Sequence, residues 1–278
     1  MKKRAVLFGA AGGGKRLFEP VSKKYDIVYF VDNDASKWGQ TLYEKEIYSP
    51  QILKEDNYDV VIITSAPGLE SITRQCEELG ILAGKIISSY VEMPLESRRI
   101  FLKSWAAMIQ EKIRYGACAE VGVFEGDFAK YINEYFPERK LYLFDTFEGF
   151  DSRDVREESK FSAAKAGDYN NTSVEEVLSK MPFSEKCFIC KGYFPETAEG
   201  IKEQFLFVNL DVDLYLPTYN GLNWFSKRMV QDGIILVHDY FADNFRGPKE
   251  AVDRFLSENK DLRILPIGDG LSIVIIGF

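Results

Sequence analysis

Histidine and cysteine are scarce in this chain. His238 is the single histidine among 278 residues, and only four cysteines occur. Two of them, Cys187 and Cys190, form a Cys-x-x-Cys pair, but tetrahedral zinc needs four ligands and the chain has no second pair. The pair stands in the β-like run KCFICKGYF, so we expect thiols buried on a strand rather than a metal or redox site.

Long apolar runs and an excess of positive charge are also missing. The longest apolar runs have about six to eight residues, far fewer than a membrane span requires. After the charged start Met1-Lys-Lys-Arg, a Gly-rich turn interrupts the apolar stretch too early for a secretory signal. The formal net charge is −8 and the isoelectric point is about 5.0, which argues against nucleic acid as the main partner. We expect a cytoplasmic protein without a membrane span.

The chain does contain a regular alternation of short β-rich runs and helical stretches, which is typical of α/β folds with parallel sheets. Its hydrophobic content of 46% is enough for well-buried cores. The alternation occurs twice. The first copy predicts strands over 4–10, 26–32, 58–65 and 84–90, with helices over 11–25 and 68–80. We assign it to a small Rossmann-like domain, residues 1–92.

The connection between the two copies contains Pro94, which we expect to interrupt any helix over residues 91–97. Ser97 could then cap a long amphipathic helix over 98–116. We place this linking helix within residues 93–117.

The second copy predicts a doubly wound sheet over residues 118–278. Residues 148–185 are polar and rich in turns, so they indicate an insertion that forms a partly helical lid. The chain ends in two β-like runs around Gly268-Asp269-Gly270, which predicts an antiparallel hairpin on the otherwise parallel sheet.

A first Gly-rich turn follows the first predicted strand. In the Gly-x-Gly-x-x-Gly fingerprint of dinucleotide sites, Gly9 and Gly14 take the outer positions, Ala11 takes the middle one, and Gly12 follows it. Asp32 ends the next strand, where that fingerprint has its acidic residue. Two readings stay open: a mononucleotide or nucleotide-sugar pocket formed by these residues, or a turn whose glycines serve only close packing.

A second Gly-rich turn, from Glu120 through Gly122 to Gly126, lies between a strand and a helix of the second copy. Glycine lets the backbone approach a ligand, and Asp145 at the end of the next strand could bind both hydroxyls of a ribose. The spacing differs from the dinucleotide fingerprint and is similar to the first motif of S-adenosylmethionine-dependent methyltransferases. The alternative is again a turn with packing glycines.

Acidic residues and the single histidine follow two further strands. Asp211 and Asp213 end the run FVNLDVD, and His238-Asp239 ends the run GIILVHD. Adjacent parallel strands bring their carboxyl ends together, so we expect these side chains to converge near Asp145. Carboxylates that lie close together need a cation. Two carboxylates and an imidazole could hold Mg²⁺ or Mn²⁺, whereas the alternative for His238 is a satisfied core histidine.

Taken together, these motifs resemble those of a known enzyme family. From about Ala119 to the end, the chain resembles the macrocin O-methyltransferase family, which comprises class I, metal-dependent sugar O-methyltransferases that use S-adenosyl-L-methionine. The matching segments are AEVGVFEGDFAKY, LYLFDTFEGF, KGYFPET, LDVDLYLPTYNGL and GIILVHDYF. The N-terminal domain is similar to the Rossmann-like domains that precede some polysaccharide-biosynthesis enzymes.

The resemblance implies a role for several residues. Asp211 falls on a metal ligand that also serves as the general base, and Asp239 falls on a second metal ligand. His238 replaces a carboxylate that many relatives have there. The positions that fall on cofactor contacts are Glu120, Gly122, Gly126, Asp145, Thr146 and Phe147. Asp213 should share a strand face with Asp211 as a supporting residue.

The predicted function is therefore methylation of a sugar hydroxyl in glycan or natural-product biosynthesis, on a sugar-containing small molecule or a nucleotide- or lipid-linked acceptor. A homodimer is the expected assembly. Two alternatives stay open: a nucleotide-sugar oxidoreductase or epimerase that uses the Gly9 turn, and a non-catalytic binding partner with a methyltransferase fold.

Overall fold

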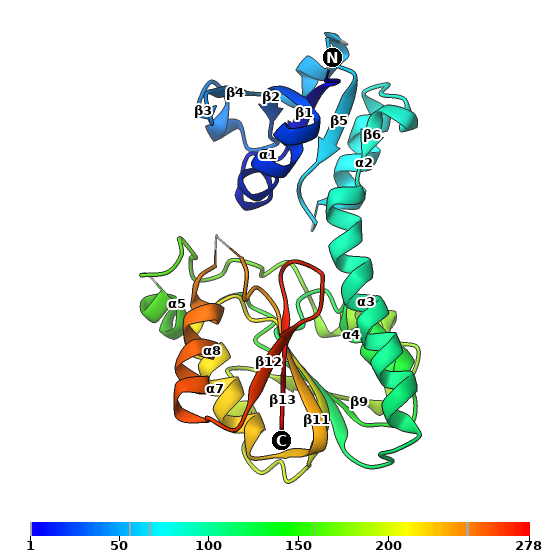
Figure 1. Cartoon of the computed structure of the whole chain (residues 1–278), viewed down its shortest axis with the longest axis vertical. Coiled ribbons are helices and arrows are strands. Elements are labelled where there is room, and N and C mark those ends of the chain that lie inside the picture. The colour runs from blue at the N-terminus through cyan, green and yellow to red at the C-terminus, as the bar shows by residue number, and fades with distance from the viewer. Residues whose placement is uncertain (1, 56, 67, 159, 243–244) are drawn as a thin grey trace. The chain divides into compact units, whose positions relative to one another are not determined.

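The computed structural model describes residues 2–55, 57–66, 68–158, 160–242 and 245–278. The chain divides into two compact units, Met1–Glu96 and Ser97–Phe278. Each unit is an α/β arrangement around one largely parallel sheet (Figure 1), as the two alternations predicted. Within the described part of the chain, no helix has the length and apolar character that a membrane span requires.

The N-terminal unit contains a six-stranded sheet with the order β3-β4-β2-β1-β5-β6. Leu17 and Val21 of α1 (Gly12–Lys24) pack on one face, and Ile72 and Cys76 of α2 (Leu69–Glu78) pack on the other. The strands are β1 (Arg4–Phe8), β2 (Asp26–Val31), β3 (Thr41–Leu42), β4 (Lys45–Tyr48), β5 (Val60–Ile63) and β6 (Ile86–Ile87). The sheet is the one that the sequence predicted, extended by a hairpin.

The hairpin of β3 and β4 was missing from the sequence prediction. Its two turn residues, Tyr43 and Glu44, have φ angles of 50° and 61°. Such left-handed turns usually carry Asn-Gly or Asp-Gly, which is the signal that identifies a hairpin in a sequence. Here no such signal is present, so β4, which pairs in parallel with β2, could not be recognised.

The C-terminal unit contains a seven-stranded sheet with the order β12-β13-β11-β10-β7-β8-β9. Strand β13 runs antiparallel to both β11 and β12, which confirms the predicted terminal hairpin. The strands are β7 (Ala117–Val121), β8 (Leu141–Asp145), β9 (Cys187–Lys191), β10 (Phe205–Leu210), β11 (Met229–Val237), β12 (Arg263–Pro266) and β13 (Ile273–Ile276).

Helices cover both faces of this sheet. One hydrophobic core includes residues of α3 (Ser89–Gln110), α4 (Ala129–Tyr135) and α6 (Val174–Lys180). The other includes residues of α7 (Tyr215–Ser226) and α8 (Gly247–Glu258), which lie side by side in Figure 1. The remaining helix is α5 (Ser152–Glu158). Short 3₁₀ turns occur at Ala35–Lys37, Pro50–Glu55, Ala83–Lys85, Ser184–Lys186 and Glu196–Ala198.

One expectation about the connecting segments was wrong. Pro94 does not interrupt a helix, because α3 runs through it from Ser89. Ser88 accepts the first bonds of this helix from Val91 and Glu92, so Pro94 lies in its second turn and deprives it of one backbone bond. The insertion is partly helical, as predicted, and it also packs into the core, since Val177 of α6 is fully buried.

The Cys-x-x-Cys pair lies on β9, as predicted. Cys187 packs against the core on the α3 face of the sheet, and Cys190 packs against the core on the α7 face. Burial raises the pKa of each thiol to about 11. The two sulfur atoms point to opposite faces, so the pair consists of half-buried strand thiols rather than a shared ligand set.

Candidate active site

The site begins where two neighbouring strands end. Leu210 of β10 and Val237 of β11 are register partners in a parallel pair, so Asp211 and His238 leave the sheet side by side. The backbone continues this pairing for one more step, because the His238 amide donates to the Leu210 carbonyl at 2.9 Å. This is the convergence that the sequence predicted for the two motifs.

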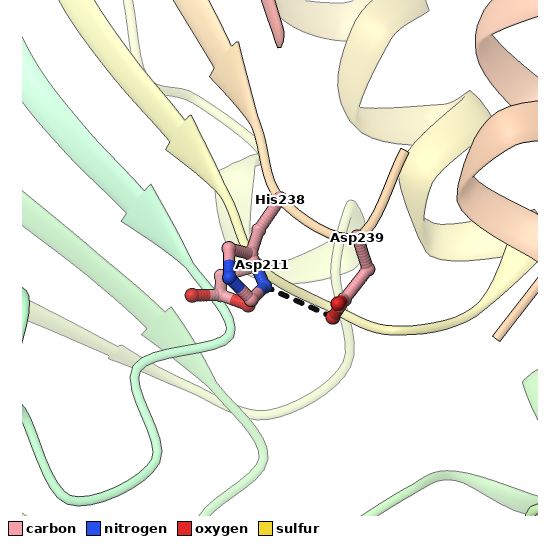
Figure 2. Close-up of side chains that lie close together, drawn as sticks. All are labelled: Asp211, His238 and Asp239. Carbon is pink, nitrogen blue, oxygen red and sulfur yellow. Dashed lines mark hydrogen bonds and ion pairs between the residues drawn. The ribbon is translucent and has the colours of Figure 1, made fainter. Parts of the chain in front are cut away.

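The three predicted metal ligands come together. His238 Nδ1 lies 3.1 Å from an Asp211 carboxylate oxygen and 2.9 Å from an Asp239 carboxylate oxygen (Figure 2). One potential ligand atom from each of the three residues falls within 4.8 Å of the others. Asp239 adopts a φ of 58°, a conformation that aspartate tolerates better than most residues and that turns its side chain back toward His238.

Asp213 reaches the cluster by a different route from the one expected. Strand β10 ends at Leu210, and Asp213 has a φ of 59°, so it does not share a strand face with Asp211. Its carboxyl instead hydrogen-bonds the Asp239 carboxylate. Burial and the charge of Asp239 raise the pKa of Asp213 well above its usual value, so that Asp213 acts as the donor.

Arg98 of α3 is a part of the cluster that sequence reasoning missed. Its guanidinium donates to Asp211 at 2.8 Å and stacks over the Phe128 ring, with 4.1 Å between the guanidinium carbon and the ring centroid. Arg98 is only 7% exposed. It lies 113 residues from Asp211 in the chain, and no motif connects the two, so the fold alone brings them together.

The charges of the cluster shift its protonation. Burial acts to raise the pKa of Asp211, but His238 and Arg98 outweigh it and hold this pKa below its ordinary value. Burial likewise opposes the charge on His238, while Asp211 and Asp239 raise its pKa to about 10. Without another cation, the imidazolium and the Arg98 guanidinium together therefore balance the two carboxylates.

This donor set fits a divalent cation. Two ionised carboxylates and one imidazole offer oxygen and nitrogen ligands from a small, partly buried volume. The imidazolium occupies the place between the carboxylates that a cation would take, and the imidazole must lose its proton to bind a metal.

Asp145 holds the second Gly-rich turn. Its carboxylate accepts hydrogen bonds from the amides of Val123 and Phe124, at 2.7 and 2.9 Å, and from the amide of Phe147 at 2.8 Å. Gly122 has a φ of 81°, and a Cβ on it would lie 2.0 Å from the Asp211 carbonyl oxygen. The turn thus packs directly against the backbone of the acidic cluster.

Glu120 lies beneath the cluster and is 1% exposed. One oxygen accepts a bond from Asn209 at 2.6 Å, while the other has no partner among the described residues. Burial and the nearby Asp211 raise the pKa of Glu120 to about 8. This buried oxygen is open to a further hydrogen bond, from a water molecule or from a ligand.

The other predicted cofactor positions make local contacts. Thr146 donates to the Gly149 carbonyl at 2.7 Å, and Phe147 is buried in the core with a φ of 55°. Gly126, with a φ of 79°, would place a Cβ 3.1 Å from Val177. The residues at these positions shape the loop beside Asp145.

The first Gly-rich turn is closely packed within its own unit. Asp32 accepts from the Ala10 amide at 2.8 Å and from Lys37 at 3.1 Å. A Cβ on Gly9 would lie 2.5 Å from a Thr64 hydroxyl, and one on Gly14 would lie 2.1 Å from the Gly9 carbonyl oxygen. Gly12 begins α1, whose N-terminus has no side-chain cap. The packing role of these glycines and a nucleotide pocket both stay predictions.

Comparison with known proteins decides the family. Residues 97–265, more than half of the chain, match the family model described as Macrocin-O-methyltransferase (TylF). The chain belongs to the macrocin O-methyltransferase family. It is an S-adenosylmethionine-dependent O-methyltransferase, as the motifs predicted. Residues 1–87 match the model described as C2185-like, N-terminal. A comparison with curated proteins found no match.

Two solved structures share the fold of the present chain. The O-methyltransferase NovP is 19% identical with a TM-score of 0.52, over 64% of this chain and 78% of NovP. The calicheamicin methyltransferase CalS11 is 17% identical with a TM-score of 0.56, over 76% of this chain and 90% of CalS11. Both confirm the class I methyltransferase sheet with its antiparallel C-terminal strands.

Proposed function

We propose that the protein transfers the methyl group of S-adenosylmethionine to a sugar hydroxyl with the assistance of a divalent metal ion, in glycan or natural-product biosynthesis. The observation that carries this proposal is the convergence of Asp211, His238 and Asp239 within 4.8 Å, beside the Gly-rich turn of a methyltransferase sheet. The sugar acceptor is supported by the family resemblance.

Asp211, His238 and Asp239 would hold the metal ion, with Mg²⁺ or Mn²⁺ the ions that suit this donor set. A bound divalent cation lowers the pKa of a hydroxyl group that it coordinates. The protein's own part is to keep both carboxylates ionised and close together, which the neighbouring Arg98 does for Asp211 at 2.8 Å.

Asp211 is the proposed general base. Because its pKa is held low, it is ionised at neutral pH and can accept the proton of the acceptor hydroxyl. The oxygen forms a bond to the methyl carbon as the sulfur–methyl bond breaks, which leaves S-adenosylhomocysteine, the methylated sugar and a protonated Asp211. Positioning of the two substrates supplies most of the acceleration.

The cofactor would lie over the second Gly-rich turn, between Glu120 and Asp145. The unpartnered Glu120 oxygen is available to a polar group of the cofactor. The Asp145 carboxylate already fixes the loop through three amides, and a ribose would bind it at the outer edge of this arrangement. Gly126, Thr146 and Phe147 complete the proposed contacts.

A turnover experiment tests the proposal. The full chain is incubated with S-adenosylmethionine and a panel of methyl glycosides and nucleotide sugars, in MgCl₂, MnCl₂ or EDTA, and S-adenosylhomocysteine is measured. We expect turnover on at least one sugar, a loss in EDTA, and a loss of at least about 100-fold in Asp211→Asn. The exposed Asp261→Asn is the matched control. Equal turnover in EDTA contradicts the metal role, and turnover on no sugar of the panel contradicts the acceptor class.

A further inference from the structure

An open cavity of about 420 Å³ lies in the C-terminal unit. Its volume is within the range of small-molecule sites, which is roughly 300–1,000 Å³. Four of its lining residues come from the predicted insertion and one from the segment between β11 and α8; they are Ala163, Ala164, Asp168, Tyr169 and Phe245. None of these residues has a role in the function proposed so far.

Tyr169 connects this cavity to the acidic cluster. Burial raises its pKa, and the charges of Asp213, Asp239 and Asp211 raise it further, so the phenol lies within electrostatic reach of the cluster. The residue nevertheless keeps 39% of its surface exposed. A group that bound against this ring would therefore lie next to the carboxylates at the ends of β10 and β11.

The aromatic wall of the cavity is built from separate segments. The Tyr169 ring packs edge-on against Phe124 of the Gly-rich turn and against Phe150, with centroid distances of 5.4 and 5.2 Å. Phe150 in turn contacts Phe245 at 6.4 Å. The wall therefore extends from the cofactor turn across the insertion to the segment after β11.

Backbone bonds hold the wall in place. The Phe150 amide donates to the Asp168 carbonyl at 3.0 Å, and the Gly167 amide donates to the Phe150 carbonyl at 3.0 Å. Gly149, with a φ of 80°, allows this approach, because a Cβ there would lie 2.4 Å from the Asp168 carbonyl oxygen. The ring of Tyr169 is thus positioned before any ligand binds.

The same segment is bonded to the cofactor turn. The Thr172 hydroxyl donates to the Phe124 carbonyl, and the Asn171 amide group donates to the Glu125 carboxylate at 3.2 Å. The segment that lines the cavity is therefore bonded directly to the turn that would hold the cofactor. This is the arrangement that methyl transfer between two bound molecules requires.

The chemistry of the lining limits the ligand. Aromatic rings attract C–H groups to their faces, and a pyranose presents such a face while keeping hydroxyls at its edge. Asp168 is the one charged residue among the described residues that line the cavity, whereas His238 and Arg98 balance the carboxylates of the neighbouring cluster. A phosphate or carboxylate placed against Asp168 would be repelled.

We propose that this cavity is the acceptor site, and that it takes a pyranose whose apolar face packs on Tyr169 and Phe245 and which carries no phosphate or carboxylate in the cavity. The inference rests on the proposed sugar O-methylation and names its acceptor subsite. Any nucleotide or lipid attached to the acceptor lies outside the cavity.

Binding of simple sugars tests the inference. The full chain, loaded with S-adenosylhomocysteine and MgCl₂, is titrated with uncharged methyl pyranosides, glucose 6-phosphate and glucuronic acid, and binding is followed by saturation-transfer NMR. Tyr169→Ala and Phe245→Ala should each weaken pyranoside binding about tenfold, whereas Tyr169→Phe, which keeps the ring, should weaken it about threefold. Affinity for S-adenosylhomocysteine, measured by calorimetry, should change by less than about twofold.

Tyr115→Ala is the matched control, because Tyr115 is 58% exposed in the same unit and does not line the cavity. If the wild type binds pyranosides and both alanine variants bind them equally well, the cavity is not the acceptor site and the proposed function still stands. If glucose 6-phosphate binds as tightly as the pyranosides, the stated ligand class is wrong. If the wild type binds cofactor but no sugar, the proposed sugar acceptor fails as well.

Discussion

Asp211 has two cationic neighbours, Arg98 at 2.8 Å and His238 at 3.1 Å, and each plays a different part. The imidazole can exchange its proton for a metal ion, whereas the guanidinium stays charged at every relevant pH. Arg98 would therefore keep Asp211 oriented and ionised when a metal ion replaces the His238 proton beside it.

Arg98→Met tests this division at the residue scale. The substitution keeps the volume of the side chain but leaves the partly buried Asp211 without its guanidinium, so we expect the free energy of unfolding to fall by about 2–4 kcal/mol. Urea denaturation measures it. Arg99→Met, on the same helix and bonded to the Tyr135 hydroxyl at 2.7 Å, is the control and should change stability by less than about 1 kcal/mol. Equal losses in the free energy of unfolding would show that the ion pair with Asp211 stabilises the fold no more than the Arg99 contact does.

The sequence could identify the three residues of the proposed metal site but not their surroundings. Asp211, His238 and Asp239 each follow an apolar strand, and parallel strands end at one edge, so their convergence follows from the pattern. Arg98 and Tyr169 carry no such signal. One lies on a helix and the other in a turn-rich insertion, and only the tertiary packing brings them to the cluster.

At the scale of elements, the turn after β7 is constrained by the turn after β10. Gly122 has a φ of 81°, and the Asp211 carbonyl oxygen lies where its Cβ would be. The glycine thus lets the second Gly-rich turn pack against the backbone of the acidic cluster. This contact in turn fixes the shape of the turn that would hold the cofactor. The two readings of this turn, ligand approach and packing, describe one arrangement.

Gly122→Ala should therefore displace the Asp211 loop and abolish methyl transfer. A Cβ 2.0 Å from a backbone oxygen cannot be accommodated without movement, so we expect a stability loss above about 3 kcal/mol, seen as a lower unfolding midpoint. Gly167→Ala is the matched control, since Gly167 has a φ of 83° with open space around it, and it should cost about 1 kcal/mol. Similar losses in both variants would contradict the packing argument.

Helix α5 carries a buried carboxyl that makes stability depend on pH. Burial raises the pKa of Asp154 to about 6, even though the Tyr193 hydroxyl donates to it at 2.8 Å. Because the folded-state pKa is raised, the contribution of Asp154 to stability is fully present below its unfolded pKa of about 3.9 and is lost as pH rises through about 6.

Asp154→Asn should remove this dependence. Relative to the wild type, the variant's free energy of unfolding should rise between pH 4 and pH 7, by at most about 3 kcal/mol. Urea denaturation across this range measures the difference, with Asp261→Asn as the exposed control. A difference that stays flat with pH would refute the role of Asp154.

Some elements could be predicted from the sequence and others could not. The strands around Asp145 and Asp211 have apolar runs bounded by turns, and they were located correctly. Pro94 was misleading, because α3 continues through a proline in its second turn despite the lost backbone bond. The hairpin through Tyr43 and Glu44 was missed because its turn lacks glycine.

At the scale of the whole molecule, the division into Met1–Glu96 and Ser97–Phe278 separates the proposed chemistry from the N-terminal sheet. Every residue proposed to contact cofactor, metal ion or acceptor belongs to the second unit. In the first unit, Asp32 accepts a bond from the Ala10 amide beside the closely packed Gly9 turn. The predicted homodimer and cytoplasmic location stay predictions.

A shortened chain of residues 89–278 tests this separation. It keeps α3 whole, including Arg98, and should bind S-adenosylhomocysteine with a Kd within about twofold of the full chain. Calorimetry gives the affinity, and circular dichroism checks that the shortened chain is folded. A folded product that binds cofactor about tenfold more weakly would show that the N-terminal unit contributes to the cofactor site.

Metal binding by the full chain tests the central claim most directly. Manganese is titrated into the S-adenosylhomocysteine complex, and free Mn²⁺ is followed by electron paramagnetic resonance for the wild type, Asp211→Asn, Asp239→Asn and the control Asp261→Asn. We predict one Mn²⁺ site per chain in the wild type and the control, lost in both site variants, with cofactor affinity retained throughout. Mn²⁺ binding that is unchanged in Asp211→Asn and Asp239→Asn would contradict the proposed centre.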